Sequence, residues 1–306
     1  MRALFLGTPA AAVPSLAALA DVADVELVVT RPDRPSGRSR RPAPPAVKLA
    51  ALEFGFPVAQ PDSVDHLRRV VDETPAEVAL VVAYGRILPS DVIAALPHGF
   101  LNVHFSLLPR WRGAAPVERA ILEGDAETGV TLMIIDEGLD TGPVVSALET
   151  PIEPDETGGS LTARLSYLGA KLVDDVVPDY LAGRRRAAAQ LAAGVTIARR
   201  LTRDEARLDG SWSVTRAERA VRAFHPRPGA WIETPEGLVK VLAAVPVDIE
   251  LSPGAIQPVD GSPCAGFEGG ALELIEVQPA GKRPVGGRAW MHGRRGRGTT
   301  MLPAPT

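Results

Sequence analysis

The hydrophobic pattern near the start of the chain predicts a strand, a helix and a second strand. Residues 2–7 and 25–30 are short apolar runs typical of buried strands. Residues 13–19 between them have helical spacing, with Pro14 tolerated in a first turn. Three such elements in so short a stretch predict a βαβ unit with a parallel sheet, and therefore an α/β fold.

The same alternation of elements continues to residue 183. Further strands are predicted at 57–58, 77–83, 100–104, 128–135 and 144–148. Helices are predicted at 47–53, 65–74, 90–96 and 115–122, with Ser90 as the N-cap of the third. A longer helix starts at Thr157 or Ser160, places its leucines on one face, and is kinked or ended by Pro178.

The pattern changes after residue 183. Residues 184–203 contain six arginines and no acidic residue, which indicates a basic linker. From residue 204 a helix at 213–223 precedes short strands at 230–234, 238–245, 254–259 and 271–277, separated by Gly and Pro. Such strands are typical of a small β-barrel. We therefore divide the chain into domains at 1–183 and 204–306, joined by the linker 184–203.

Composition sets limits on this picture. The chain has 306 residues, of which 45% are hydrophobic and 23% charged, as in ordinary globular proteins. The single cysteine, Cys264, excludes an internal disulfide and any Cys/His zinc motif, so we expect no metal. The apolar opening is broken too early for a signal peptide, and no segment reaches the length of a membrane helix. We expect a cytoplasmic, monomeric protein without a membrane partner.

Basic residues are concentrated locally although the net charge is −4. Residues 31–48 hold six Lys or Arg and one Asp among many Pro, Gly and Ser, and residues 282–297 hold six Lys or Arg without an acid. The composition of residues 31–48 supports equally a solvated loop and a mobile arm that contacts a polyanion. The turn after the first strand, Gly7-Thr8-Pro9, lacks the glycine pattern of dinucleotide-binding and P-loop proteins.

The stretch 102–116, NVHFSLLPRWRGAAP, carries the chemistry. In an extended backbone Asn102, His104 and Ser106 would share one face. A half-buried edge strand with a solvated polar face is the alternative, but the histidine and the sharp turn that follows favour a catalytic strand end. A second polar loop, 136–142, follows another predicted strand and contains three carboxylates and two glycines.

Several motifs in order along the chain resemble those of methionyl-tRNA formyltransferases. They are residues 7–9, 31–38, 81–89, 102–116, 128–142, 205–209, 222–231 and 276–284. The resemblance covers nearly the whole chain, although Ala11 and Gly210 depart from its aromatic residues. It implies a Rossmann-like formyltransferase domain with a mostly parallel sheet, followed by an OB-like barrel that binds tRNA. It also implies transfer of the formyl group of 10-formyltetrahydrofolate to the amino group of methionine on initiator methionyl-tRNA.

The resemblance also implies site residues. Asn102, His104 and Asp140 match the catalytic set. The chemistry of formyl transfer suits Asn102 as oxyanion donor, His104 as a second donor to that oxygen or as proton carrier, and Asp140 as the group that orients His104 and relays the amine proton. Folate contacts fall on Val82, Ala83, Tyr84, Gly85, Ile87, Leu88, Ser106, Leu107, Leu108, Pro109, Asp136, Gly138 and Leu139. A supporting role suits Ser106 better than a chemical one, and a cis Leu108–Pro109 bond would suit the turn, although most such bonds are trans. tRNA contacts fall on Arg34, Arg38, Arg40, Arg41, Arg110, Arg112 and Arg200.

Other functions remain open from the sequence. A related enzyme could formylate a sugar nucleotide or glycinamide ribonucleotide, or could hydrolyse 10-formyltetrahydrofolate. An RNA-binding module that has lost catalysis is the non-enzymatic alternative. Neutralising Arg38, Arg40 and Arg41 is expected to weaken use of tRNA far more than binding of folate, because phosphate contacts depend on these charges.

Overall fold

The computed structural model describes residues 1–36 and 41–303 and divides the chain into two compact units. The first unit comprises Met1–Pro116, Glu127–Pro151 and Thr162–Ala198, and the second comprises Val117–Ala126, Ile152–Leu161 and Arg199–Thr306. Each unit is therefore assembled from stretches that are separate in the sequence. No helix in the described ranges is long and apolar enough to cross a bilayer.

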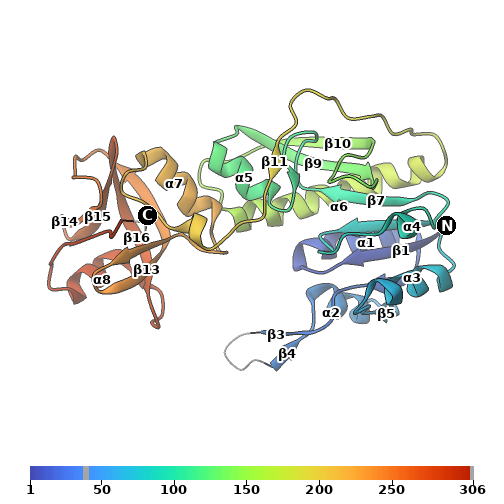
Figure 1. The fold of residues 1–306 in the computed structure, drawn as a ribbon, viewed down its shortest axis with the longest axis horizontal. Helices are drawn as coiled ribbons and strands as arrows, with labels where there is room; N and C mark the ends of the chain where they lie inside the picture. The colour runs from blue at the N-terminus through green and yellow to red at the C-terminus, as the bar shows by residue number, and fades with distance from the viewer. Residues whose placement is uncertain (37–40, 304–306) are drawn as a thin grey trace. The chain divides into compact units, whose positions relative to one another are not determined.

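The first unit is built on a seven-stranded sheet (Figure 1). Its strands lie in the order β10 (Val144–Pro151), β9 (Glu127–Ile134), β7 (Phe100–His104), β6 (Val78–Val82), β1 (Arg2–Gly7), β2 (Asp24–Val29) and β5 (Val58–Ala59). The pairs from β7 to β5 are parallel, whereas β9 is antiparallel to both of its neighbours. This mostly parallel sheet confirms the predicted Rossmann-like architecture.

Continuous apolar runs explain why β1 and β6 lie in the interior of the sheet. Every residue of β6 is buried, as is every residue of β1 after Arg2, which is the pattern of strands covered on both faces. The helices of this unit are α1 (Val13–Val22), α2 (Ala46–Glu53), α3 (Val64–Glu73), α4 (Ser90–Ile93) and most of α6 (Gly158–Leu181). α3 and α4 contribute Leu67, Val71 and Val92 to a core shared with β1 and β6.

Two helix ends differ from the predictions. Ser90 is the first residue of α4 and not its N-cap, because Pro89 occupies the cap position without a side-chain hydrogen bond. α6 continues through Pro178 to Leu181, so of the two predicted alternatives, a kink or an end at Pro178, the end is wrong. Val176, Val177 and Leu181 are all buried, so packing of this last turn offsets the hydrogen bond that proline cannot donate.

The basic stretch 31–48 contains a short antiparallel ribbon. β3 (Arg34–Ser36) pairs with β4 (Arg41–Ala43), with Arg34 opposite Ala43, and Figure 1 shows the ribbon projecting beside α2. Among the described residues of this stretch, the two short strands form a separate two-stranded sheet, and helix α2 begins at Ala46. Arg38 and Arg40 lie outside the described residues.

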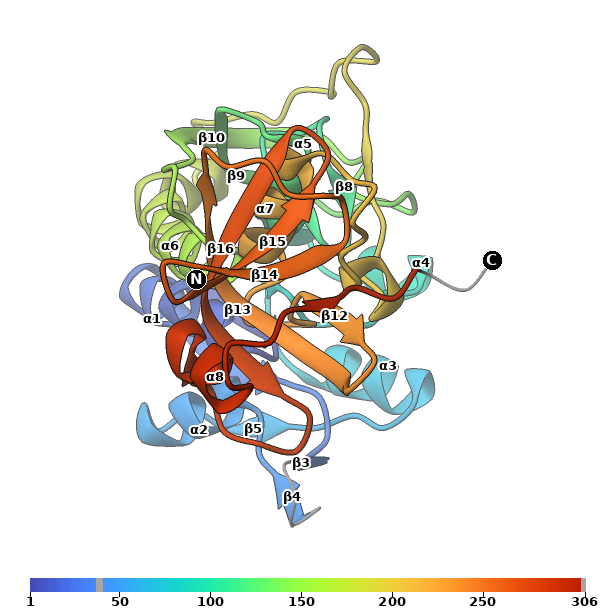
Figure 2. The ribbon, with the colours of Figure 1, turned by 90° about the vertical axis from the view of Figure 1, so that its left-hand side faces the viewer.

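The second unit is a nearly closed antiparallel barrel, as predicted (Figure 2). The strand order is β12 (Trp231–Thr234), β13 (Gly237–Val247), β16 (Gly270–Pro279), β15 (Ser262–Phe267), β14 (Ala255–Val259) and β18 (Thr299–Thr300), and β17 (Val285–Gly286) also pairs with β16. α7 (Val214–Ala223) packs against β13, and α8 (Gly287–Gly293) packs against β15 and β16.

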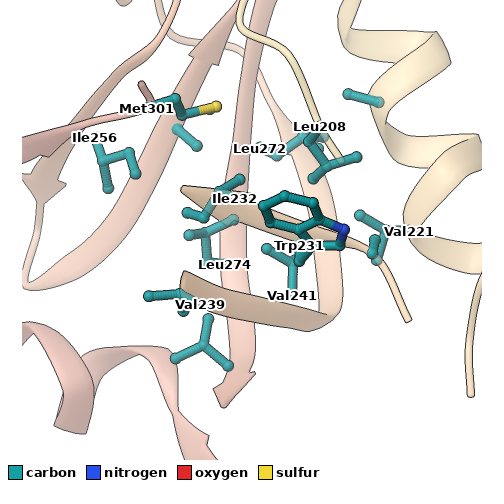
Figure 3. Packing of buried hydrophobic residues seen from close by; sticks show 14 of the residues in the cluster. Leu208, Val221, Trp231, Ile232, Val239, Val241, Ile256, Leu272, Leu274 and Met301 are labelled. Carbon is teal, nitrogen blue, oxygen red and sulfur yellow. The ribbon is translucent and has the colours of Figure 1, made fainter. Parts of the chain in front are cut away.

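The barrel core is filled by side chains from β12 to β16, from α7 and α8, and from the segments before α7 and after β18. Figure 3 shows Trp231 among the apolar side chains of Leu208, Val221 and Ile232. β15 was not predicted, because its sequence Ser-Pro-Cys-Ala-Gly-Phe lacks apolar alternation and contains turn-forming residues. All of its residues are nevertheless buried, since it lies between β14 and β16.

Candidate active site

Strand β7 carries Asn102 and His104 at the centre of the first unit's sheet. Asn102 lies opposite Met133 and His104 opposite Thr131 of β9, and the apolar residues Leu101 and Val103 are buried. The strand ends at His104, so Ser106 does not continue the predicted face. The chain turns instead, and the fully buried Ser106 hydroxyl donates to the Arg110 carbonyl at 2.6 Å.

The turn after β7 holds the His104 ring. His104 is 6% exposed, and its Nε2 lies 2.8 Å from the Trp111 carbonyl oxygen. Because a carbonyl only accepts, this contact places a proton on Nε2. The turn contains a cis Leu108–Pro109 bond, which the sequence had left open. The Arg110 guanidinium lies over the Trp111 indole at 4.4 Å.

Asp140 approaches the other nitrogen of the same ring. Its Oδ2 lies 3.7 Å from His104 Nδ1 and accepts a hydrogen bond from the Gly113 N–H at 2.8 Å. Asp140 comes from the loop after β9, which confirms that the two predicted polar stretches meet. The two nitrogens of His104 therefore face a carbonyl and a carboxylate. The carbonyl belongs to Trp111, and the Asp140 carboxylate is hydrogen-bonded to Gly113 of the same turn.

Backbone strain is concentrated around this pair. Trp111 and Asp140 have φ angles of 63° and 51°, and Ala83, at the end of β6, has a φ angle of 47°. A side chain at positive φ costs about 1–3 kcal/mol and persists only where the surrounding structure fixes it. Such residues gather at functional sites, and here Trp111 and Asp140 both contact the His104 ring, while Ala83 follows the neighbouring strand β6.

Two family matches cover most of the chain. Residues 1–177 match the formyl transferase family, and residues 200–295 match the C-terminal domain of formyl transferases. A methionyl-tRNA formyltransferase from Halorhodospira halophila is 43% identical over 307 residues, covering 96% of this chain and 96% of that protein. One from Myxococcus xanthus is 42% identical over 302 residues, covering 96% and 95%. The chain belongs to the methionyl-tRNA formyltransferase family.

More distant solved structures share the fold. HypX from Aquifex aeolicus, in complex with tetrahydrofolic acid, has a TM-score of 0.66 at 17% identity, covering 95% of this chain and 47% of that one. An N-formyltransferase from Helicobacter canadensis, in complex with folinic acid and dTDP-3-aminofucose, has a TM-score of 0.64 at 16% identity, covering 89% and 98%. At these identities the similarity shows the architecture alone.

The folate contacts that the family resemblance implies lie on two loops and on the turn after β7. At the end of β6 and in the loop after it, Val82, Tyr84 and Leu88 are buried, whereas Ala83, Gly85 and Ile87 are exposed. Burial raises the pKa of the Tyr84 phenol. In the loop after β9, the Asp136 carboxylate accepts from the Gly138 N–H and the Thr141 hydroxyl, and Leu139 is exposed. On the turn, Leu107, Leu108 and Pro109 are half-buried.

The loop after β6 is also tied to the segments that follow β1 and β2. The Thr8 hydroxyl donates to the Tyr84 carbonyl at 2.9 Å, and Arg31 donates from Nη1 to the Gly85 carbonyl at 3.0 Å. Burial, followed by the charges of Arg86 and Arg34, lowers the pKa of Arg31. This loop therefore has a fixed backbone at the carboxyl end of the sheet, where ligands of such folds bind.

The arginines that were predicted to contact tRNA lie in different surroundings. Arg34 is exposed in β3, Arg41 begins β4, and Arg200 is exposed in the second unit. Arg112 is half-buried and donates from Nε and Nη2 to the Gln190 side-chain oxygen at 3.0 and 2.7 Å. No cluster of three or more metal-ligating side chains occurs among the residues that the structure describes.

Two residues at the site were not identified from the sequence. Gln190 and Thr196 lie in the stretch predicted as a basic linker, whose residues up to Ala198 belong to the first unit. The Thr196 hydroxyl accepts from the Trp111 N–H at 2.8 Å, and β11 (Ile197–Ala198) pairs with β8 (Arg112–Gly113). In the sequence these two residues stand out only as polar residues among alanines and a glycine, and this pattern does not indicate which distant residues they contact.

Proposed function

We propose that this protein transfers the formyl group of 10-formyltetrahydrofolate to the amino group of methionine on initiator methionyl-tRNA. Membership of the methionyl-tRNA formyltransferase family supports the choice of reaction. The observation that carries the proposal is the pairing of His104 with Asp140 beside Asn102 on β7. This arrangement provides a hydrogen-bond donor and a proton acceptor, which acyl transfer to an amine requires.

Asn102 is assigned to the developing oxyanion. Attack of an amine on a formyl carbon produces a tetrahedral adduct whose oxygen gains negative charge. A side-chain amide donates at every relevant pH, and fixed donors of this kind are a large catalytic contribution. Asn102 is half-buried in a paired strand, so its position is set by the sheet.

His104 is assigned to the amine proton. Its Nε2 already donates to the Trp111 carbonyl, so Nδ1 is the nitrogen that can gain or release a proton. The Asp140 carboxylate at 3.7 Å from Nδ1 favours the positively charged ring that forms when the proton arrives. Asp140 keeps its place because the Gly113 N–H holds the same oxygen.

The loops after β6 and β9, together with the turn 106–109, are assigned to the reduced folate. The exposed backbone at Ala83 and Gly85 follows a central parallel strand, and open sheets of this kind bind ligands at that end. A flat pterin presents alternating donors and acceptors, which backbone N–H and C=O groups can match. When bound, the folate supplies the formyl group as a substrate. The chain's own task is to orient it toward Asn102 and His104.

The tRNA is assigned to the basic residues Arg34, Arg38, Arg40, Arg41, Arg110, Arg112 and Arg200. The ribbon formed by β3 and β4 projects from its unit, which suits contact with a large ligand (Figure 1). Guanidinium groups pair with phosphate oxygens in a fixed geometry. Because the net charge is −4, such local contacts must account for the attraction to RNA, and binding is expected to weaken with added salt.

Formyl transfer to charged initiator tRNA tests the proposal directly. The assay supplies 10-formyltetrahydrofolate with methionyl initiator tRNA, and uses uncharged tRNA and free methionine as controls. Formylation of the charged tRNA alone, with kcat about 10²–10³-fold lower in Asn102→Ala, is the expected result. Turnover of the folate without formylated tRNA, or formylation of a small amine instead, would overturn the proposal.

A further inference from the structure

The Gln190 side chain connects the two loops that hold His104. Its Nε2 donates to the carbonyl oxygens of Asp140 and Gly142, both at 2.8 Å. Its Oε1 accepts from Nε and Nη2 of Arg112, at 3.0 and 2.7 Å. One planar amide therefore joins the loop after β9 to the turn after β7.

Together these contacts form a closed circuit of hydrogen bonds and chain segments around the catalytic histidine. His104 contacts the Trp111 carbonyl on one side and the Asp140 carboxylate on the other. Trp111 is followed in the chain by Arg112, and the Arg112 side chain returns through Gln190 to the backbone of Asp140. Movement of either loop away from His104 would break at least one contact of Gln190.

The segment that carries Gln190 contributes little to a hydrophobic core. Leu191, Val195 and Ile197 are 73%, 40% and 49% exposed. Gln190 and Thr196 are half-buried, and both make hydrogen bonds to the site. This segment leaves its large apolar side chains exposed to water but turns two polar side chains toward the site. Its role is therefore better explained by orienting the residues around His104 than by burying apolar surface.

We propose that Gln190 is a positioning residue for the formyl transfer, an inference that rests on the proposed function. It fixes the Asp140 carboxylate and the Trp111 carbonyl relative to each other, and so sets the orientation of the His104 ring. Small displacements of such groups have large kinetic effects, since a shift of about 1 Å can cost about a hundredfold in rate.

The chemistry of a side-chain amide explains why glutamine suits this position. Its NH₂ group has two donors, which match the two carbonyl oxygens, and its oxygen accepts from the guanidinium. Glutamate would keep the Arg112 contact but would place a carboxylate against the carbonyls of Asp140 and Gly142. Methionine would keep the length of the side chain but would lose the hydrogen bonds to the two carbonyls and those from Arg112.

Steady-state kinetics of Gln190→Met and Gln190→Glu form the main test. Gln190→Met is expected to lower kcat by about 10–100-fold, with KM for 10-formyltetrahydrofolate within about twofold of the wild type. Gln190→Glu is expected to be impaired as well, because it loses the contacts to the Asp140 loop. Gln278→Met in the barrel removes one donor to the Lys282 carbonyl and is the matched control, with unchanged kcat expected.

A double-mutant cycle separates positioning from a general effect on folding. If Gln190 acts through Asp140, Gln190→Met should lower kcat by less than about twofold in a protein that already carries Asp140→Asn. An equal effect in both backgrounds, a change confined to KM, or an unchanged kcat in Gln190→Met would overturn the inference. Should Gln190→Met fail to fold, Gln190→Glu provides the same comparison.

Hydrogen exchange tests the circuit of contacts around His104 without relying on activity. The Gly113 N–H is protected by Asp140, so it should exchange faster in Gln190→Met than in the wild type, whereas Gln278→Met should leave it unchanged. Unchanged exchange at Gly113 in Gln190→Met would overturn the inference. If the wild type formylates no charged tRNA, the proposed function fails, and the exchange result still decides whether Gln190 fixes the Asp140 loop.

Discussion

Replacing Asp140 by asparagine isolates the charge that faces His104. The substitution keeps the size of the side chain and an oxygen that can accept from the Gly113 N–H. It removes the negative charge 3.7 Å from His104 Nδ1. The geometry of the turn should survive, so any loss of activity reports on electrostatics.

The distance sets the size of the effect. At 3.7 Å and an effective dielectric constant of about 20, two unit charges attract by about 4.5 kcal/mol. Asp140 is 21% exposed, so solvent screening reduces the useful part to about 2 kcal/mol. If this attraction is gained only as His104 becomes charged, kcat should fall about 30-fold in Asp140→Asn.

The assay is formylation at saturating concentrations of both substrates. Glu137→Gln is the matched control, because it removes one exposed carboxylate from the same loop, and its kcat should stay within about twofold of the wild type. An Asp140→Asn enzyme with wild-type kcat would show that the carboxylate charge does not act in the reaction. Equal losses of kcat in Asp140→Asn and Glu137→Gln would indicate that the overall negative charge of the loop matters, and not the contact of Asp140 with His104.

Two further substitutions test the packing around the site and the buried charges. In Gly113→Ala the new Cβ would lie 2.7 Å from the Ala198 oxygen at a φ of 122°, so we expect a Tm lower by several degrees and at least a tenfold lower kcat. Gly55→Ala adds the same atom at a φ of 81° with nothing within 4 Å, so thermal unfolding of this variant measures backbone strain alone; equal Tm losses in the two variants would refute the clash. Burial raises the pKa of Glu118 above its ordinary value of 4.5, so its contribution to stability is present below pH 4.5 and is lost as the pH rises through the folded-state pKa. Glu118→Gln should therefore unfold at a higher temperature than the wild type near pH 7 and show little difference near pH 4, and a difference that is the same at both pH values would contradict this reading.

Local patterns in the sequence were sufficient to predict the sheet, and together with the family resemblance they singled out Asn102, His104 and Asp140 as candidate catalytic residues. The apolar runs of β1 and β6 correctly predicted buried parallel strands, and the polar positions on β7 and in the loop after β9 led to His104 and Asp140 as candidates. Because β9 runs antiparallel to β7, the pairing of the two strands does not by itself bring these loops together, and the loop after β9 reaches His104 through Asp140. The roles of these side chains, and the contacts with folate and tRNA, stay predictions.

The contacts of Gln190 could not be predicted in the same way. This residue is 50 positions from Asp140 and 78 from Arg112, and no periodicity connects them. β15 escaped prediction for a different reason, since its burial comes from neighbouring strands and not from its own apolar pattern. In both cases the decisive information lies in tertiary pairing.

The pairing of β11 with β8 has a consequence for the order in which the protein becomes active during synthesis. Every strand of the sheet is complete by Pro151, so the sheet can form while the rest of the chain is still being made. Gln190, Thr196 and Ala198 arrive later, after the long helix α6. A nascent chain that ends before Gln190 can therefore hold His104 on its strand but lacks the side chains that contact the two loops around it. These contacts form only after the segment from Gln190 to Ala198 has left the ribosome.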